Sequence, residues 1–249
     1  MNNSLPIHNF LSEESQFFRF GFDVLRGNKK FWKEELRDPF ENYLRKALSD
    51  FEHDLFLCSL EKYHDVYKEN NHHHAFIKNI SRVIPKDIIS PRNYFLENVI
   101  SQLSIIFQRK LGIYKNKIEF RVVRPNQPDN NLLHRDHWFP YFRNLLNLYI
   151  PLSGSNHSSV LRVVPESHHW TDDDVVPTFK YNQGKRLGSN GILYSTPTIK
   201  SCEKNIIEHK PDIQEGDLMY FSPMIIHGGG ANTNKSVTRF SLEIRLEVI

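Results

Sequence analysis

The stretch NLLHRDHWFPYF, residues 131–142, places His134 and Asp136 two positions apart. In an extended chain, residues at this spacing share a face, so an imidazole and a carboxylate would point to the same place. Because the chain holds 13 His and 29 acidic residues among 249, roughly 1.5 His-x-Asp/Glu triplets are expected by chance. The triplet therefore indicates a metal site only if another strand supplies a third ligand.

His227 is the candidate for that third ligand. It lies in EGDLMYFSPMIIHGGG, where an apolar strand follows a Gly-Asp turn and three glycines follow the histidine. Glycines let the backbone or a ligand approach closely. Two imidazoles and one carboxylate on one side of a metal leave coordination positions open, as in non-haem Fe(II) sites that use O2. We therefore expect His134, Asp136 and His227 to be catalytic metal ligands.

Arg239 and Ser241 stand twelve and fourteen residues beyond His227, on what should be the next strand. Their spacing puts them on one face, where a guanidinium and a hydroxyl could bind a carboxylate together. A cosubstrate with two carboxylates could chelate the iron at one end and be held by this pair at the other. Arg239 and Ser241 are thus the expected cosubstrate-binding residues.

Four strings occur together and in order over about residues 115–249: HRD, SSVLRVVPESHHW, GDLMYFSPMIIHGGGANTNKSVTR and FSLEIRL. They resemble the phytanoyl-CoA dioxygenase family of Fe(II)/2-oxoglutarate-dependent oxygenases. The resemblance implies an α+β fold built on a double-stranded β-helix, a jelly-roll or cupin-like barrel, with buttressing helices. It also implies Fe(II) as cofactor, with 2-oxoglutarate and O2 as cosubstrates.

The resemblance also assigns site residues. By position, His134, Asp136 and His227 match the iron ligands, and Arg239 matches the arginine that holds the distal carboxylate of 2-oxoglutarate. Asn147, on the strand after the triplet, is expected to be a further cosubstrate contact.

The chain departs from the family pattern at two turns. Ser158-Ser159 stands where Asn-Gly is usual, and Glu166 where Gly is usual. Neither change touches an iron or cosubstrate position, so we expect altered turn geometry with unchanged chemistry.

The order of elements agrees with this fold. Aromatic and aliphatic residues at three- and four-residue spacings predict helices over residues 10–70 and again over 91–113, whereas polar ENNHHHAFIKN, 69–79, predicts a solvated loop. After Gly112, short apolar runs that alternate with turn residues predict strands, IEFRVVRP, NLLNLYIPL, SVLRVVPESH, GDLMYFSP and SVTRFSLEIRLEVI among them. We expect a helical cover over 1–90 and a catalytic core over 91–249, joined in one structural unit.

Substrate recognition is expected at the mouth of the barrel. His137 and Trp138 follow the triplet and could line that mouth, and the Gly- and Asn-rich stretch 171–200 is placed to form a lid. Several basic residues fall in segments expected nearby, which suggests an anionic small-molecule substrate such as a sugar nucleotide or acyl thioester: Arg121, Arg124, Arg135, Arg143, Lys185 and Arg186.

Composition excludes several other classes. The net charge of +3 comes without long Lys/Arg blocks, so no nucleic-acid partner is expected. No apolar run approaches the ~20 residues of a membrane span. The two cysteines, Cys58 and Cys202, lie far apart, which fits reduced thiols and a cytoplasmic protein. Oligomeric state has no signature in the sequence.

The expected reaction is hydroxylation of a small biosynthetic metabolite, with release of succinate and CO2. Desaturation, cyclisation and epimerisation can start from the same oxidant and stay open. Two other classes compete: a cupin-type isomerase or epimerase that does not use oxygen, and a non-catalytic metal- or ligand-binding module. Arg239 and Ser241 favour the oxygenase, because neither alternative needs a carboxylate clamp facing a metal.

Overall fold

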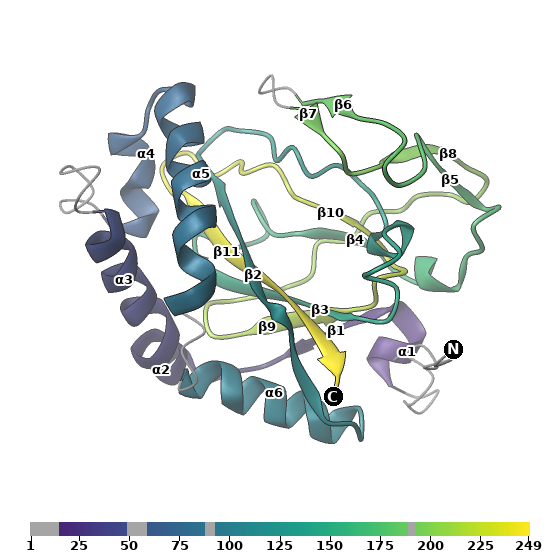
Figure 1. Ribbon diagram of the computed structural model, residues 1–249, viewed down its shortest axis with the longest axis horizontal. Coiled ribbons are helices and arrows are strands. Elements are labelled where there is room, and N and C mark those ends of the chain that lie inside the picture. Colours follow the sequence, from purple (N-terminus) through teal and green to yellow (C-terminus); the bar gives the residue numbers. More distant parts are fainter. Residues whose placement is uncertain (1–14, 49–58, 88–92, 189–192) are drawn as a thin grey trace.

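The computed structural model describes residues 15–48, 59–87, 93–188 and 193–249. Helices fill the first part of the chain and strands the second, as Figure 1 shows. The helices are α1 Gln16–Phe20, α2 Lys29–Trp32, α3 Asp38–Leu48, α4 Tyr63–Val66, α5 Asn70–Asp87 and α6 Tyr94–Ile106, with a π-helical segment, Lys33–Arg37, between α2 and α3. The strands are β1 Phe22–Leu25, β2 Leu111–Val123, β3 Leu146–Ser153, β4 Arg162–Val164, β5 Val175–Pro177, β6 Arg186–Leu187, β7 Leu193–Tyr194, β8 Ile199–Cys202, β9 Leu218–Phe221, β10 Ile226–Gly228 and β11 Arg239–Val248. No described helix is both long and apolar enough to cross a membrane.

The main sheet has five strands in the order β1-β9-β3-β11-β2, and every neighbouring pair is antiparallel. A smaller layer forms where β10 pairs with β4 and is continued by bridges at His134 and His209. Helices α2 to α6 curve around one side of the main sheet, while β4 and β10 lie on its other side (Figure 1). This arrangement is the expected jelly-roll barrel with buttressing helices, and all five strand-forming runs named from the sequence form strands.

Successive side chains along each strand point alternately towards the helices and into the barrel. On β11 the even-numbered residues, such as Leu242 and Ile244, are buried in the large apolar core that the sheet shares with the helices. The inward face of the barrel has its own apolar cluster, in which Tyr149 and Met219 join Val163 of β4. Each strand thus presents one face to the helices and the other to the barrel interior.

The helical half differs from the sequence prediction at three places. Residues 70–79 are part of helix α5, whereas a loop was expected: Phe76 is buried against Tyr63 and Tyr67, with ring centroids 4.8 Å from each. In the part of α5 whose side chains are described, Phe76 and Ile77 pack against the core, and the polar residues around them hide this contact in the sequence pattern.

A strand also interrupts the expected helical region. Gly21, at φ +83°, ends α1 in the left-handed conformation, and Phe22–Leu25 then pairs with β9 as an edge strand. Farther along, α6 ends at Ile106 and β2 already begins at Leu111, so the predicted helix over 91–113 extends too far. Cys58 lies outside the described residues.

Candidate metal and cosubstrate site

The three predicted metal ligands converge. His134 and His227 face each other on an antiparallel bridge, with N–O distances of 2.9 and 3.0 Å, and Asp136 begins the short 3-10 turn Asp136–Trp138. One ligand atom from each side chain lies within 4.8 Å of the other two, and all three residues are buried. Two imidazoles and a carboxylate in this arrangement could hold a divalent metal ion.

The backbone prepares both imidazoles to act as ligands. His134 Nδ1 lies 2.8 Å from the carbonyl oxygen of Leu132, and His227 Nδ1 lies 3.1 Å from that of Ile225. Since a carbonyl only accepts, each Nδ1 carries the hydrogen, which leaves the lone pair of Nε2 for a metal. Burial, together with the neighbouring His134 ring, lowers the pKa of His227 to about 3, so this ligand stays neutral.

Arg245 holds the third ligand. Its Nη2 and Nε donate to Oδ2 of Asp136 at 2.9 and 3.1 Å, while Oδ1 lies 3.4 Å from His134 Nε2. Burial alone would raise the pKa of Asp136, but Arg245 and the two imidazoles hold it well below its usual range. Sequence reasoning missed Arg245, although it shares the inward parity of Arg239 on β11 and could have been found from that alternation.

Unpaired polar atoms mark the predicted cosubstrate residues. Nε of Arg239, Oγ of Ser241 and both amide atoms of Asn147 are buried and lack a hydrogen-bond partner within the described part of the chain. Buried polar groups of a folded protein normally have partners. These atoms, together with a donor set suited to Fe(II), fit a site that receives a polar ligand such as 2-oxoglutarate.

Arg239 is fixed from its other side. Its Nη1 donates to the carbonyl oxygens of Ser159 and of Gly230, the latter at 2.9 Å, and its Nη2 pairs with the buried carboxylate of Asp129. Burial opposes ionisation, yet Arg239 and Arg121 lower the pKa of Asp129. A Cβ at Gly229 would overlap the Asp129 carboxylate, so this position has to be glycine. Sequence reasoning also missed Asp129, for which no local pattern exists.

The four residues predicted to contact substrate are not gathered at one place. His137 is half-buried, with Nε2 3.8 Å from Asp172, and Arg143 is exposed and donates to the His137 carbonyl oxygen at 3.3 Å. Trp138 packs beside Val164 and Ile226, and its buried Nε1 has no partner among the described residues. Arg121 lies apart from these three, in the barrel, where Nε binds Glu243 at 2.5 Å.

The inserted segment 171–200 meets the aromatic residues that follow the triplet. Tyr181 of this segment packs its ring against Phe139 and Tyr141, with centroids 5.5 and 5.4 Å apart. Arg135 points away from the metal ligands and is fully buried, donating to the carbonyl oxygens of Ser167 and Trp170 at 2.6 and 3.1 Å. Its role here is therefore structural, and it does not contribute to an anion-binding mouth.

Several solved structures share this fold at low sequence identity. The apo form of the non-heme monooxygenase ThoJ is 12% identical, with 94% of this chain and 76% of that chain covered and a TM-score of 0.55. Apo EctD from S. alaskensis is 13% identical, with 98% and 82% covered and a TM-score of 0.55. The epimerase SnoN in complex with Fe3+, alpha ketoglutarate and nogalamycin RO is 12% identical, with 94% and 81% covered and a TM-score of 0.51.

Among curated protein sequences, none matches this chain significantly. The sequence profile of the family described as Phytanoyl-CoA dioxygenase (PhyH) matches residues 32–241, which includes every predicted metal ligand and Arg239. The chain therefore belongs to the phytanoyl-CoA dioxygenase family, whose enzymes are Fe(II)- and 2-oxoglutarate-dependent oxygenases.

Proposed function

We propose that this enzyme hydroxylates a small biosynthetic metabolite, with conversion of 2-oxoglutarate and O2 to succinate and CO2. The observation that carries the proposal is the convergence of His134, Asp136 and His227 in one barrel. The same barrel buries polar atoms that have no partner in the described part of the chain, on Arg239, Ser241 and Asn147. A barrel that no longer bound a ligand would have no physical reason to keep buried polar atoms without partners, because each such atom costs folding free energy.

Each residue has a distinct role in this proposal. Nε2 of His134, Nε2 of His227 and the Asp136 carboxylate hold Fe(II), which when bound supplies the activation of O2. Arg239 and Ser241 bind the distal carboxylate of 2-oxoglutarate, and the amide of Asn147 donates or accepts a further hydrogen bond to it.

Arg245 orients Asp136 by occupying one carboxylate oxygen. It is a positioning residue, because it acts through Asp136.

The substrate is proposed to bind where His137 and Trp138 adjoin the metal ligands, beneath the inserted segment 171–200. Nε1 of Trp138 has no partner among the described residues and is a donor for a substrate oxygen. Arg143 would favour an anionic substrate, whereas Arg121, predicted for the same role, is paired with Glu243 away from this place. We also propose that residues 1–90 serve as a cover that stabilises the catalytic core over 91–249, since helices and sheet share one apolar core.

An anaerobic titration tests the metal and cosubstrate assignments without a known substrate. Fe(II) and then 2-oxoglutarate are added to metal-free protein while the weak visible charge-transfer band of the chelated 2-oxo acid is followed. We expect the band in the wild type and in the control His72→Ala, whose histidine is exposed on α5, and its loss in His134→Ala and His227→Ala. Iron binding without the band in the wild type would redirect the assignment to an oxygen-independent isomerase or a binding module.

Product analysis then decides the reaction type. The same fold serves an epimerase, SnoN, and a carbocyclase, SnoK, which is 14% identical to this chain with a TM-score of 0.52. Hydroxylation adds one oxygen atom to the substrate, cyclisation or desaturation removes two hydrogens, and epimerisation leaves the composition unchanged. A product without added oxygen would refute the hydroxylation proposal while leaving the metal site intact.

A further inference from the structure

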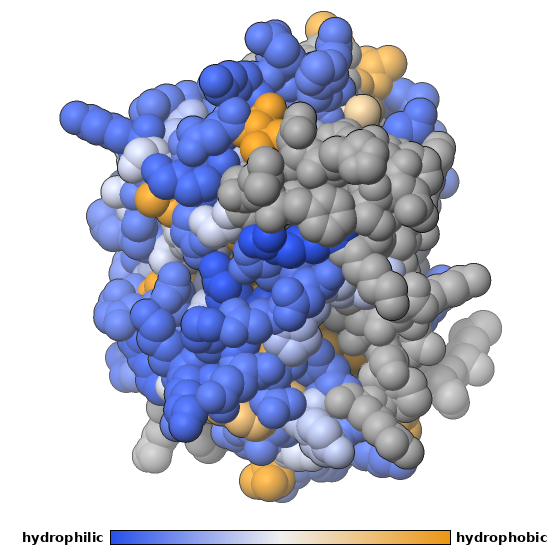
Figure 2. Space-filling view, turned by 90° about the vertical axis from the view of Figure 1, so that its left-hand side faces the viewer, coloured by the Kyte–Doolittle hydropathy of each residue, from blue (hydrophilic) through white to orange (hydrophobic). Residues whose placement is uncertain are grey.

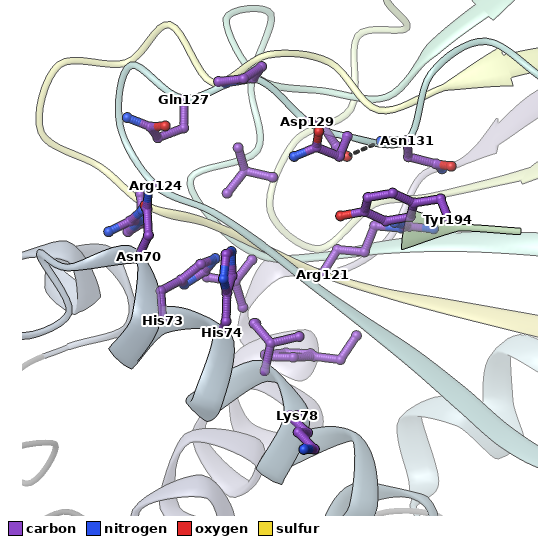
Figure 3. A pocket seen from close by; sticks show the side chains of 16 residues that line it. Asn70, His73, His74, Lys78, Arg121, Arg124, Gln127, Asp129, Asn131 and Tyr194 are labelled. Atoms are coloured by element: carbon purple, nitrogen blue, oxygen red, sulfur yellow. Dashed lines mark hydrogen bonds between the residues drawn. The ribbon is translucent and has the colours of Figure 1, made fainter. Parts of the chain in front are cut away.

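A cleft of about 460 Å³ opens between helix α5, strand β2 and the loop 124–131. We refer to it as the α5–β2 cleft. Figure 3 shows His73, His74 and Lys78 projecting from α5 on one side, with Asp129 and Asn131 on the other. The metal ligands are not part of its lining. Its volume is in the range of pockets that hold small metabolites.

The charge in the α5–β2 cleft is mainly positive. Lys78, Arg121 and Arg124 line it, and Asp129 is the single acidic side chain among the described lining residues. Arg239 already neutralises Asp129 from inside the barrel. Glu243 likewise pairs with Arg121, so the positive charge that the lining presents to a ligand rests on Arg124 and Lys78.

Arg124 contributes most to this positive charge. Its side chain is buried and donates to the carbonyl oxygens of Tyr67 and Lys68 at 2.9 and 2.5 Å, and to the side-chain oxygen of Asn70. All three acceptors are neutral, and none of the ion pairs among the described residues includes Arg124. Buried charges are normally balanced by a partner of opposite sign, so an anion in the cleft would supply a counter-charge that the described residues do not.

Two neighbouring groups support the same conclusion. His73 accepts or donates a 2.9 Å hydrogen bond to the Tyr63 hydroxyl, and burial together with the charge of Arg124 lowers its pKa to about 4. It therefore stays neutral and adds a hydrogen-bonding group. At the other end, Tyr194 is held by Arg186, whose guanidinium carbon lies 4.8 Å from the ring centroid, so an aromatic ring borders the cleft.

We propose that the α5–β2 cleft binds a small molecule that carries a phosphate or carboxylate group, with the anion beside Lys78 and Arg124 and the remainder against Tyr194. The ligand is either the substrate of the oxygenase or a separate effector, because both would be recognised by the same chemistry. Asn131 of the lining precedes His134 by three residues, at most ~10 Å of extended chain. A ligand in the cleft that is the substrate should therefore perturb the metal site, whereas a separate effector need not.

The described residues around the cleft do not form a continuous apolar surface (Figure 2). Figure 2 shows the side of the molecule that carries α3, α4 and α5, and the described residues there are mostly hydrophilic with scattered hydrophobic ones. A polar small molecule suits this surface better than an apolar protein segment.

Isothermal titration of the full-length protein with ribose 5-phosphate tests the proposal, with ribose as the neutral counterpart and ionic strength held constant. We expect saturable binding of the phosphate with one site per chain and no binding of ribose. Lys78→Glu, at an exposed position, should weaken binding about tenfold or more. Lys200→Glu, an equal charge change at an exposed position of β8, should leave it unchanged.

Two results would overturn the proposal that the cleft binds an anionic small molecule. Absence of saturable phosphate binding overturns the proposal, as does an equal loss of affinity in Lys78→Glu and Lys200→Glu, which would reflect net charge alone. Tyr194→Ala should weaken ribose 5-phosphate binding without affecting the response to Lys78→Glu.

The source of the ligand is decided in protein loaded anaerobically with Fe(II) and 2-oxoglutarate. A shift of the charge-transfer band on addition of ribose 5-phosphate assigns the cleft to the substrate, and an unshifted band with retained binding assigns it to a separate ligand. Since calorimetry needs neither iron nor 2-oxoglutarate, failure of the cleft proposal is distinguishable from failure of the proposed oxygenase function.

Discussion

Replacing Asn147 by leucine separates the stability of the barrel from its ability to bind 2-oxoglutarate. Asn147 lies at the centre of the main sheet on β3, paired with Phe221 on one side and Arg245 on the other, and is 3% exposed. Neither its amide nitrogen nor its amide oxygen has a partner in the described structure. A leucine side chain at this position would fill a similar volume without burying an unsatisfied polar group.

The expected effect on the fold is stabilisation. A buried donor or acceptor without a partner costs about 1–3 kcal/mol, so its removal should raise the free energy of unfolding by a similar amount. For a chain of this length, 1 kcal/mol corresponds to roughly 2–4 °C, so the melting temperature of the metal-free variant should rise by about 2–12 °C. The same change should weaken 2-oxoglutarate binding, because the cosubstrate loses a hydrogen-bonding group.

Thermal unfolding of metal-free protein and the anaerobic charge-transfer titration measure the two effects separately. Ser153→Ala is the matched control, because Ser153 lies on the same strand, is equally buried, and donates to the Thr238 carbonyl oxygen at 3.1 Å. It should lower stability and leave 2-oxoglutarate binding unchanged. If Asn147→Leu lowered the melting temperature and left 2-oxoglutarate affinity intact, Asn147 would be a structural residue and the reasoning from unpaired atoms would be wrong.

Three further predictions follow from single contacts. Glu166 adopts φ +67°, a conformation that costs side-chain-bearing residues about 1 kcal/mol, so Glu166→Gly should raise the unfolding free energy by up to that amount in denaturant titrations; lower stability would contradict it. Asp129→Asn removes the charge that neutralises Arg239, so 2-oxoglutarate should bind about tenfold more tightly, as measured by the charge-transfer band. Weaker binding would show instead that Asp129 holds the Arg239 side chain in place for the cosubstrate. His73 has a folded pKa of about 4 beside Arg124 and an unfolded value near 6.5, so the unfolded chain binds more protons between these pH values. The free energy of unfolding should therefore fall as the pH drops from 6.5 towards 4, by roughly 2 kcal/mol more in the wild type than in His73→Gln. If the free energy of unfolding depended on pH equally in both proteins, His73 would not be the cause.

The sequence was most informative where chemistry and alternation act together. His134 and Asp136 share a face because they are two positions apart, and His227 lies beside them across its bridge to His134. That the three residues bind a metal stays a prediction. Inward parity likewise places Arg239 and Ser241 on one side of β11. These features are local or depend on a single strand pairing, so they can be predicted from the spacing of residues in the sequence.

Contacts between residues far apart in the sequence could not be predicted from spacing. Asp129 pairs with Arg239 across 110 positions, and no pattern in its loop distinguishes this acid from the others. The loop predicted over 69–79 is wrong from Asn70 on, because Phe76 packs against Tyr63 within helix α5, a contact that the polar sequence around it does not indicate. The departure at Glu166 was recognised from the sequence as a turn, but its positive φ required the structure.

The two faces of β11 explain why this barrel can hold polar chemistry at all. Phe240, Leu242, Ile244 and Leu246 face the helices and are buried in the large apolar core, so the hydrophobic stabilisation of the sheet comes mainly from outside the barrel. The inward face carries Arg239, Ser241, Glu243 and Arg245 instead. Because the helices satisfy the sheet's apolar face, the interior is free to bury charges in pairs and to leave a few atoms unpaired for a ligand. We therefore expect the helical cover to support the site as well as the fold, so variants that loosen it should lose 2-oxoglutarate binding before the barrel unfolds.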